Sequence, residues 1–264
     1  MRNGRAIRNS VQTSEKVYVN YQLDVRDRGG HSSIPRKDNP IYRLAEALVK
    51  LSKFSFPMRL TDTTRAYFAR IAQFESEPVA SDLRAVLSDQ PEAALARLSA
   101  NPFYNAQLRT TCVATMLQGG HAANALPQLA SAKVNCRIMP GEPVEEVEAA
   151  LKRVLDDDRI AVTRLDTPVL SAPSELREDV MGAIEKLSQE FFPDAVVLPV
   201  MSTGGTDGSY LRNAGIPTYG HSGLANDISD FRAHGRDERV PVQSFYQGQE
   251  YLYRLVKMLS GGGS

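Results

Sequence analysis

The ten residues VYVNYQLDVR, at Val17–Arg26, constrain the fold more than any other stretch of this chain. Val, Tyr or Leu occupies each odd-numbered position, and mostly polar residues occupy the even-numbered ones. A period of two is that of a β-strand with one buried face and one exposed face. The stretch therefore predicts a sheet that is covered by other elements on one side only.

Further elements follow in the order helix, helical insertion, strand, strand, helix and strand. Asn39 before Pro40 is typical of a helix start, and several short helical patterns broken by prolines make the insertion at about residues 61–108. This order matches a split βαβ, ferredoxin-like sandwich of four antiparallel strands with helices on one face. We place it at residues 17–167.

A hairpin is predicted from the strands Thr111–Leu117 and Leu129–Ile138. Three pairs then share one apolar face of the hairpin: Cys112–Cys136, Ala114–Val134 and Met116–Ala132. Alternation puts Arg137 on the opposite, polar face. Two reduced cysteines in a core are the favoured interpretation, and a cross-strand disulfide is the alternative if the geometry allows it.

After residue 167 the pattern becomes α/β. We expect a helix capped by Ser174, a buried strand at 195–200, a short helix at 207–213, a strand at 216–219 and a last helix from Pro241. The predicted buried stripe of that last helix is Val242, Phe245, Leu252, Leu255, Val256 and Leu259. The strands are too few for a complete sheet, so this half is an incomplete α/β segment.

Charge and hydropathy exclude several classes of partner. Lys plus Arg equals Asp plus Glu at 31 each, so no overall field attracts nucleic acid or an anionic membrane. No stretch approaches the roughly 20 apolar residues of a membrane span, and the first residues lack the apolar core of a signal peptide. We expect a soluble chain with no targeting signal and no nucleic-acid or membrane partner; its compartment stays open.

Residues that could carry chemistry lie mostly in loops. The histidines are His31, His121, His221 and His234, and a loop histidine can be plain surface or part of a site. Ser222 does not fit a nucleophile elbow, because Leu224 stands where a glycine is needed. The loop Ser202–Asp207 can bind an anion through its backbone N–H groups, or it can be a tight turn capped by Asp207.

Several segments, in order, cover nearly the whole chain: GGHSSIPRKDNPIYRLAEAL at Gly29–Leu48, GGHAANALP at Gly119–Pro127, VNCRIMPGE at Val134–Glu142, then STGGTDGSYLRNAGIPTYG and AHGRDERVPV. Together they resemble the co-catalytic di-zinc aminoacylases, carboxypeptidases and N-acyl-amino-acid deacylases, which include carboxypeptidase G and succinyl-diaminopimelate desuccinylase. The resemblance implies a catalytic α/β domain interrupted by a split βαβ lid, and the lid forms a homodimer.

The resemblance also implies roles for individual residues. His31 is similar to the lid histidine that reaches into the partner subunit's site and stabilises an oxyanion. Asn124 and Arg137 resemble the lid residues that grip the free carboxylate of a small-molecule substrate. Gly205 and Thr206 resemble the loop that lines the substrate pocket.

His234 resembles the last zinc ligand of the family. The other ligands, a His-x-Asp pair, a Glu-Glu pair and one further acidic or histidine residue, precede the lid and have no counterpart before Val17. One imidazole cannot hold a zinc ion that takes about four ligands. We therefore expect two zinc ions in the full family enzyme and no tight zinc binding by this chain alone.

The resemblance assigns residues 1–16 to a connection from the catalytic domain and 17–167 to the lid. Residues 168–260 become the C-terminal part of the catalytic domain, and 261–264 a flexible tail. The chain is then a portion of a zinc-dependent amide hydrolase for N-acyl amino acids or small peptides, inactive alone. The alternative is a non-catalytic dimerisation or carboxylate-binding module.

Overall fold

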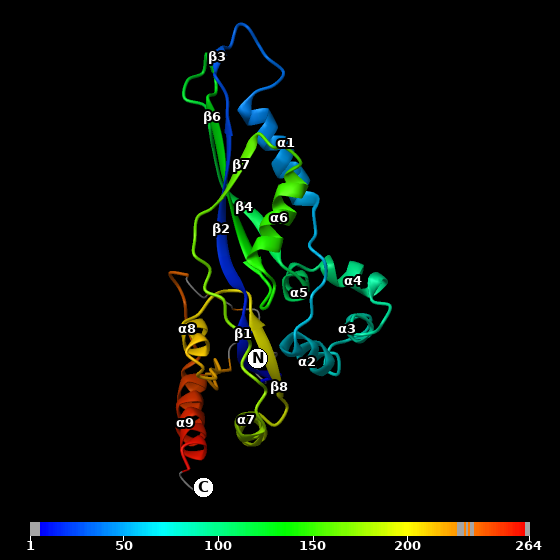
Figure 1. Cartoon of the computed structure of the whole chain (residues 1–264). Helices are drawn as coiled ribbons and strands as arrows, with labels where there is room; N and C mark the ends of the chain where they lie inside the picture. The colour runs from blue at the N-terminus through cyan, green and yellow to red at the C-terminus, as the bar shows by residue number, and fades with distance from the viewer. Residues whose placement is uncertain (1–5, 226–229, 231, 233–234, 262–264) are drawn as a thin grey trace.

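The computed structural model describes residues 6–225, 230, 232 and 235–261, and one four-stranded antiparallel sheet dominates its upper half (Figure 1). The strand order is β4-β6-β2-β7, with bounds Thr111–Gly119, Leu129–Ile138, Val17–Arg26 and Ile160–Arg164. The predicted strand Val17–Arg26 is confirmed as β2, in the interior of the sheet. The predicted mixed fold, with four antiparallel strands and helices on one face, is confirmed.

The covering helices are α1 (Pro40–Lys53) and α6 (Val144–Leu155), which pack on the apolar face of the sheet. Asn39 caps α1 as predicted, since its side chain accepts from the N–H groups of Ile41 and Tyr42 at 3.0 and 3.2 Å; such a cap contributes about 1 kcal/mol. Burial of Tyr21 on β2, of Val134 on β6 and of the other residues on the same face of the sheet shows why the alternation exists. The polar face of the sheet stays open.

The hairpin of β4 and β6 confirms that Cys112 lies opposite Cys136 but corrects their state. The two sulfurs form a disulfide, with the Cα atoms 4.1 Å apart. The favoured interpretation of two reduced core residues is therefore wrong. Residues directly opposed in an antiparallel pair are close enough for their sulfur atoms to bond.

The register of this hairpin also departs from prediction beyond Ala114. Met116 pairs with Lys133, and Leu117 takes the place opposite Ala132 that we predicted for Met116. One additional residue in β4 makes a β-bulge, which shifts every later side chain to the other face of the strand. Alternation cannot reveal an inserted residue when the residues around it are all small or apolar.

The lower half is built on a parallel pair of strands, β1 (Arg8–Glu15) and β8 (Val196–Ser202). We call this pair and its helices the β1–β8 unit. Helices α7 (Glu178–Phe191) and α9 (Val242–Leu259) cover one face, where their core includes Val11 and Val197. Lys16 alone separates β1 from β2, so the chain passes directly from this unit into the four-stranded sheet (Figure 1).

The helical insertion predicted at about residues 61–108 is present as four helices. They are α2 (Asp62–Ile71), α3 (Val79–Ala85), α4 (Glu92–Ser99) and α5 (Pro102–Leu108). Their shared core includes Leu198 of β8, so they cover the second face of the β1–β8 unit although in the sequence they lie between α1 and β4, elements of the upper half. None of the described helices is long and apolar enough to cross a membrane.

Two local predictions in the C-terminal half are wrong. Ser174 does not cap α7, which begins only at Glu178; its hydroxyl instead donates to the Thr218 carbonyl (2.8 Å) and accepts from the Thr218 N–H (2.9 Å). Residues 216–219 form no strand, and the backbone meets β1 only at the isolated Gln12–Gly220 bridge. Pro217 has no N–H to donate to a ladder, and Ser174 already uses Thr218.

Helix α9 begins after Pro241 as predicted, but its fully buried stripe agrees with the predicted one only at Leu255. The buried residues are Ser244, Gly248, Tyr251 and Leu255, whereas Val242 and Phe245 are exposed. A Cβ at Gly248 would lie 2.5 Å from Leu224 Cδ2, so only a glycine permits this close approach. A prediction from apolar side chains alone misses a face that packs through small residues.

Candidate functional site

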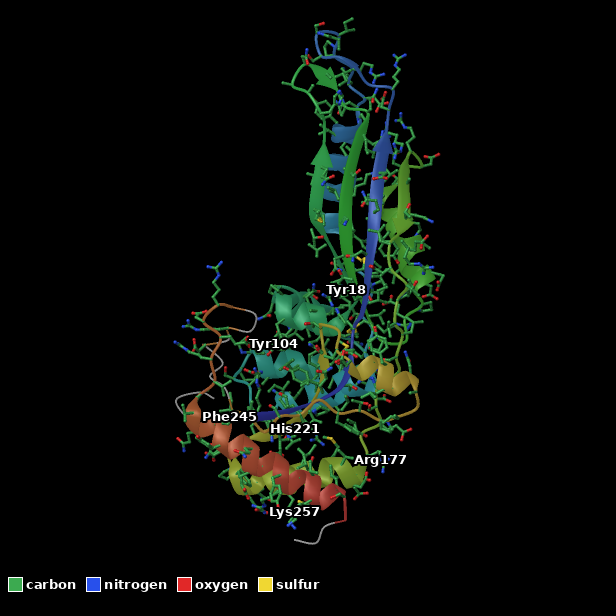
Figure 2. The ribbon with its side chains drawn as sticks, turned by 90° about the vertical axis from the view of Figure 1, so that its left-hand side faces the viewer. Tyr18, Tyr104, Arg177, His221, Phe245 and Lys257 are labelled. Atoms are coloured by element: carbon green, nitrogen blue, oxygen red, sulfur yellow. A yellow bond between two sulfur atoms is a disulfide. The ribbon has the colours of Figure 1, made fainter. Side chains whose placement is uncertain are left out.

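A cleft of about 400 Å³ lies where the β1–β8 unit meets the four-stranded sheet. The start of β2, the segment after β7 and the loop between β8 and α8 (Gly208–Asn213) line it. Gly205 and Thr206, the two predicted pocket residues, are both in that lining. Tyr18 lies at the foot of the sheet, directly above the β1–β8 unit (Figure 2).

The loop from Ser202 to Gly208 is held by its own hydroxyl groups. Thr206 Oγ1 accepts from the Gly208 N–H and from Gln12 Nε2, both at 3.3 Å, and Ser202 Oγ accepts from the Gly204 N–H at 3.1 Å. Asp207 occupies the N-cap position of α8, but its side chain makes no cap hydrogen bond. The alternative in which Asp207 caps the turn is therefore wrong, and Asp207 is one of the residues that line the cleft.

Arg137 reaches this region from the neighbouring strand β6. Its guanidinium carbon lies 4.5 Å from the centroid of the Tyr18 ring, and its Nε donates to Asn135 Oδ1 at 3.1 Å. The side chains of Val134 and Cys136 point into the core, so Arg137 is on the polar face as alternation predicts. Among the described residues, none accepts a hydrogen bond from the two terminal nitrogens of Arg137.

Buried charges lie beneath the cleft. Glu15 and Arg212 form an ion pair with an N–O distance of 2.5 Å, and both side chains are more than nine-tenths buried. Lys16 is also buried, and its Nζ donates to the Arg109 carbonyl at 2.6 Å. Burial lowers the pKa of Lys16 to about 7, although the nearby carboxylate of Glu142 opposes this shift. This side of the cleft is thus built from paired or hydrogen-bonded charges.

Two more predicted site residues, His31 and Asn124, lie at the far tip of the sheet. His31 ends the short strand β3 (Gly30–His31), which lies at the top of the molecule in Figure 1. Strand β3 pairs with β5 (Ala125–Leu126), and the Ser32 N–H donates to the Asn124 carbonyl at 2.9 Å. Gly29 enters this turn at φ +77°, where a Cβ would lie 2.8 Å from Gln128 Cγ. The two consecutive glycines therefore serve the turn that presents His31.

One ring nitrogen of His31 accepts a hydrogen bond from the backbone. The backbone N–H of Ser33 donates to Nδ1 of His31 at 3.2 Å, and a backbone N–H can only donate. Nδ1 therefore accepts, and a neutral ring carries its proton on Nε2. The exposed side chain can offer this Nε2–H to a group outside the chain.

One copy of the chain does not bring these two groups of residues together. The 10 residues of β6, at about 3.3 Å each, separate the tip from the cleft by roughly 30 Å. Asn124 and His31 lie at one end, and Arg137 and the Thr206 loop lie at the other. A single copy therefore does not assemble all of them at one site.

His234, the predicted zinc ligand, lies outside the described residues. Within the part of the chain that the structure describes, no three His, Cys, Asp or Glu side chains are grouped so that they could hold a metal ion. The described residues therefore do not form a zinc site, and the role of His234 stays a prediction.

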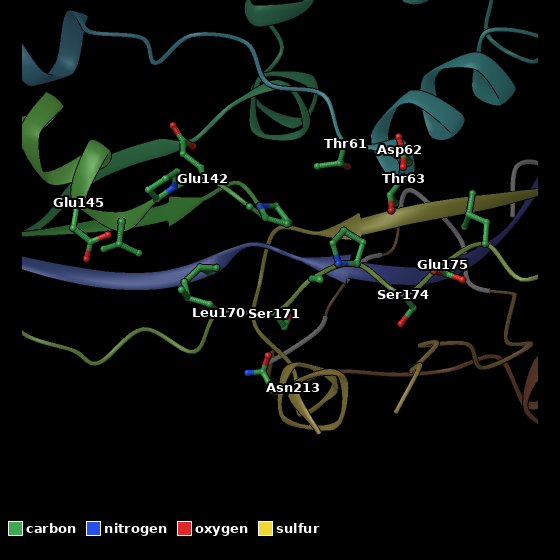
Figure 3. A pocket seen from close by; sticks show the side chains of 18 residues that line it. Thr61, Asp62, Thr63, Glu142, Glu145, Leu170, Ser171, Ser174, Glu175 and Asn213 are labelled. Carbon is green, nitrogen blue, oxygen red and sulfur yellow. The ribbon is translucent and has the colours of Figure 1, made fainter. Parts of the chain in front are cut away.

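A larger cavity of about 1020 Å³ opens on the other side of the junction (Figure 3). It contains none of the predicted site residues. Two of its carboxylates are engaged elsewhere, since Glu142 accepts from the Thr110 hydroxyl and Glu145 pairs with Arg164 at 3.2 Å. Its lining comes from the segments that connect the two halves of the molecule, so it is a gap between packed units.

Sequence reasoning missed Tyr18, Lys16 and the Glu15–Arg212 pair. Tyr18 shares the polar face of β2 with Asn20, and this alternation is a signal that could have marked it. The register that sets Tyr18 opposite Arg137 comes from the pairing of β2 with β6, which no local pattern contains. Likewise, Glu15 and Arg212 are 197 positions apart in the sequence.

Comparison with known proteins places this architecture in a family. Residues 13–162, more than half of the chain, match the family described as the M20 peptidase dimerisation domain. The chain belongs to the M20 peptidase family. Among curated relatives, the probable carboxypeptidase S-like 2 of Dictyostelium discoideum is 29% identical over 250 residues, covering 94% of this chain and 48% of that protein.

A second M20 relative is the human N-fatty-acyl-amino acid synthase/hydrolase PM20D1, 29% identical over 255 residues, which are 94% of this chain and 50% of that protein. The chain thus spans about half the length of the curated relatives it matches. An M20 metallo-carboxypeptidase, Sso-CP2 of Sulfolobus solfataricus, has the same fold at a TM-score of 0.63 and 18% identity, covering 97% of this chain and 62% of that one. Human carnosine dipeptidase 1 matches at a TM-score of 0.60 and 13% identity over 98% of this chain and 58% of that one.

Proposed function

We propose that this chain supplies the dimerisation lid and part of the substrate pocket of a zinc-dependent M20 amide hydrolase that acts on N-acyl amino acids or small peptides. One observation carries the proposal: Arg137, on a sheet that matches the M20 dimerisation domain, stands beside the cleft that the Gly205–Thr206 loop lines. Relatives named for hydrolysis of fatty-acyl amino acids and for carboxypeptidase activity support the substrate class.

The chemistry of the cleft fits a substrate with a free carboxylate. The two terminal nitrogens of Arg137 form a planar fork that matches the two oxygens of a carboxylate. Asp207, which lines the cleft, disfavours a second negative charge there. The acidic group of the substrate then points toward the sheet, and its amide bond lies over the Thr206 loop.

We further propose that the chain forms a homodimer through strand β4 and the adjoining surface of α1. Strand β4 is an edge strand, and its side chains Val113 and Leu117 are 59% and 67% exposed. Tyr42 of α1 is 58% exposed. An exposed apolar edge is a template for pairing with another strand, and a second copy presents the same edge.

The dimer gives a role to the tip residues. In the proposed assembly, His31 and Asn124 of one copy reach the cleft of the other, because they lie far from the cleft of their own copy. His31 then donates its Nε2–H to the oxygen of the scissile carbonyl, where negative charge develops. His234 is proposed as one zinc ligand; the described residues contain no site for the metal, so no step at zinc is assigned to them. Hydrolysis therefore depends on zinc ligands beyond the described residues.

Calorimetric titration with N-acetyl-L-methionine and its uncharged amide tests the pocket. We expect the chain to prefer the acid, and Arg137→Ala to reduce that preference about tenfold or more, because a hydrogen bond to a charged group contributes about 1.5–3 kcal/mol. Lys133→Ala, which changes an exposed basic residue four positions away on the same face of the same strand, is the matched control. Equal preference in the Arg137 variant and the wild type would remove Arg137 from the pocket.

Light scattering tests the dimer. We expect twice the 29.0 kDa mass of one chain, and one chain mass for Leu117→Arg. Thr163→Arg on β7, the opposite edge of the sheet, should remain dimeric. A wild-type mass of one chain at micromolar concentration would contradict the homodimer, and acid-selective binding by such a monomer would favour a carboxylate-binding module.

A further inference from the structure

Four side chains close a ring on the exposed face of the sheet at the edge of the cleft. Arg137 Nε donates to Asn135 Oδ1 (3.1 Å), Asn135 Nδ2 donates to Asn20 Oδ1 (3.0 Å), and Asn20 Nδ2 donates to the Tyr18 hydroxyl (2.7 Å). The Tyr18 ring then lies under the Arg137 guanidinium at 4.5 Å. Register explains the ring, because Tyr18 faces Arg137 and Asn20 faces Asn135 across β2 and β6.

The direction of every hydrogen bond in this ring is fixed by Arg137. A guanidinium can only donate, so Asn135 must present its oxygen to Arg137 and its NH₂ group to Asn20. Asn20 must in turn accept with its oxygen and donate to Tyr18. The Tyr18 oxygen is therefore an acceptor within the ring, and its own hydrogen is left to donate elsewhere.

Three donor groups remain at the edge of the cleft, one on Tyr18, which lines it, and two on Arg137, which lies over the Tyr18 ring. Among the described residues, neither the Tyr18 O–H nor the two terminal nitrogens of Arg137 have a hydrogen-bond acceptor. Tyr18 lines the cleft together with Thr206, and 44% of its surface is exposed. An ionised carboxylate only accepts and offers about four lone-pair positions, so it can satisfy all three groups. A neutral amide has an NH₂ group in place of one of these oxygens, and that group cannot accept a hydrogen bond from Tyr18 or Arg137.

We propose that Tyr18 is a further substrate-binding residue, whose hydroxyl donates to the carboxylate that Arg137 binds. The aromatic ring of Tyr18, together with Asn20 and Asn135, holds the Arg137 guanidinium in place. This inference rests on the proposed function and deepens it. Tyr18 selects for the acid form of the ligand, and Asn20 and Asn135 act as positioning residues through Arg137. The stacked ring restricts the guanidinium plane before the ligand arrives.

Calorimetric titration of the full chain tests this role with N-acetyl-L-methionine and its uncharged amide. We expect Tyr18→Phe, which keeps the stacked ring, to weaken binding of the acid about tenfold and to leave binding of the amide unchanged. Tyr18→Leu also removes the stacking and should weaken the acid further. Lys133→Ala, on the same face of β6 and outside the ring, should bind both ligands as the wild type does.

The outcomes separate this inference from the function on which it rests. If Arg137→Ala loses the preference for the acid but Tyr18→Phe keeps it, the role of Tyr18 is wrong and the pocket stands. If neither variant changes the preference, or the wild type binds neither ligand, the pocket itself is wrong. Equal weakening of acid and amide by Tyr18→Phe would show a structural role and overturn the proposal.

The hydrogen-bonded ring of Arg137, Asn135, Asn20 and Tyr18 can also be detected without any ligand. The Nε–H of Arg137 should give a slowly exchanging ¹⁵N nuclear magnetic resonance signal, because Asn135 accepts from it. Asn135→Ala should speed the exchange of this signal, and Lys133→Ala should not. Fast exchange of the Arg137 Nε–H in the wild type would show that the ring does not form and would remove the positioning role of Asn135.

Discussion

Replacing Lys16 by methionine should change how the stability of the protein depends on pH. Lys16 is 1% exposed in the turn between β1 and β2, and its Nζ donates to the Arg109 carbonyl. Burial lowers its pKa from 10.5 to about 7, Glu142 raises it, and Arg137 lowers it further. Methionine has a similar length and volume but binds no proton.

The sign follows from the protons bound in each state. Above pH 7 the folded chain releases the Lys16 proton, whereas the unfolded chain keeps it until its pKa of 10.5. The unfolded state then binds more protons, so the free energy of unfolding rises with pH in this window. At about 1.4 kcal/mol per pH unit, with Lys16 half-titrated near pH 7, the gain between pH 7 and pH 9 is about 2 kcal/mol.

Urea denaturation at pH 7, 8 and 9 measures this gain for the wild type, Lys16→Met and a control, Lys133→Met. Groups other than Lys16 titrate alike in all three proteins, so they cancel in the difference. We expect the advantage of the wild type over Lys16→Met to grow by about 2 kcal/mol across the range. A difference that is constant with pH would refute the claim that burial controls the charge of Lys16.

Two further predictions concern stability. Replacing Cys112 and Cys136 by serine should lower the free energy of unfolding by about 3 kcal/mol, the entropy of closing the span of 24 residues; equal urea midpoints with and without reductant would contradict the disulfide. Tyr251→Phe should cost about 1–3 kcal/mol in thermal unfolding, because its hydroxyl contacts His221 Nε2 (3.1 Å) and donates to the Ile184 carbonyl (3.2 Å). Burial lowers the pKa of His221 below its ordinary 6.5, so the unfolded chain takes up a proton at a higher pH than the folded chain does. The free energy of unfolding of the wild type should therefore decrease as the pH is lowered below about 6.5, and it should decrease less in His221→Gln.

The sequence predicts those elements whose signals are local. The alternation of Val17–Arg26 defines β2, and Asn39 before Pro40 marks the start of α1, because burial of one face and satisfaction of the first N–H groups both act on neighbouring residues. Prediction fails where packing uses residues without a strong preference. The small-residue face of α9 at Gly248 and the strand wrongly assigned around Pro217 are of this kind.

The candidate site divides in the same way. Motifs alone mark His31, Arg137 and the Gly205–Thr206 loop as residues of interest, and alternation puts Arg137 on the open face of its strand. Their separation into a tip and a cleft roughly 30 Å apart depends on the length and direction of β6. That separation, on which the proposal of two copies for one site rests, is not contained in the order of the motifs.

By itself, the sequence determines the antiparallel sheet, its covering helices, the helical insertion and the M20 motifs. These follow from the spacing of apolar residues and from short segments that keep their meaning in isolation. Only the tertiary structure decides the Cys112–Cys136 bond, the β4 bulge and the ring that joins Tyr18 to Arg137. Each depends on which residue lies opposite which across two strands, and strand register is set by the packing of the whole sheet.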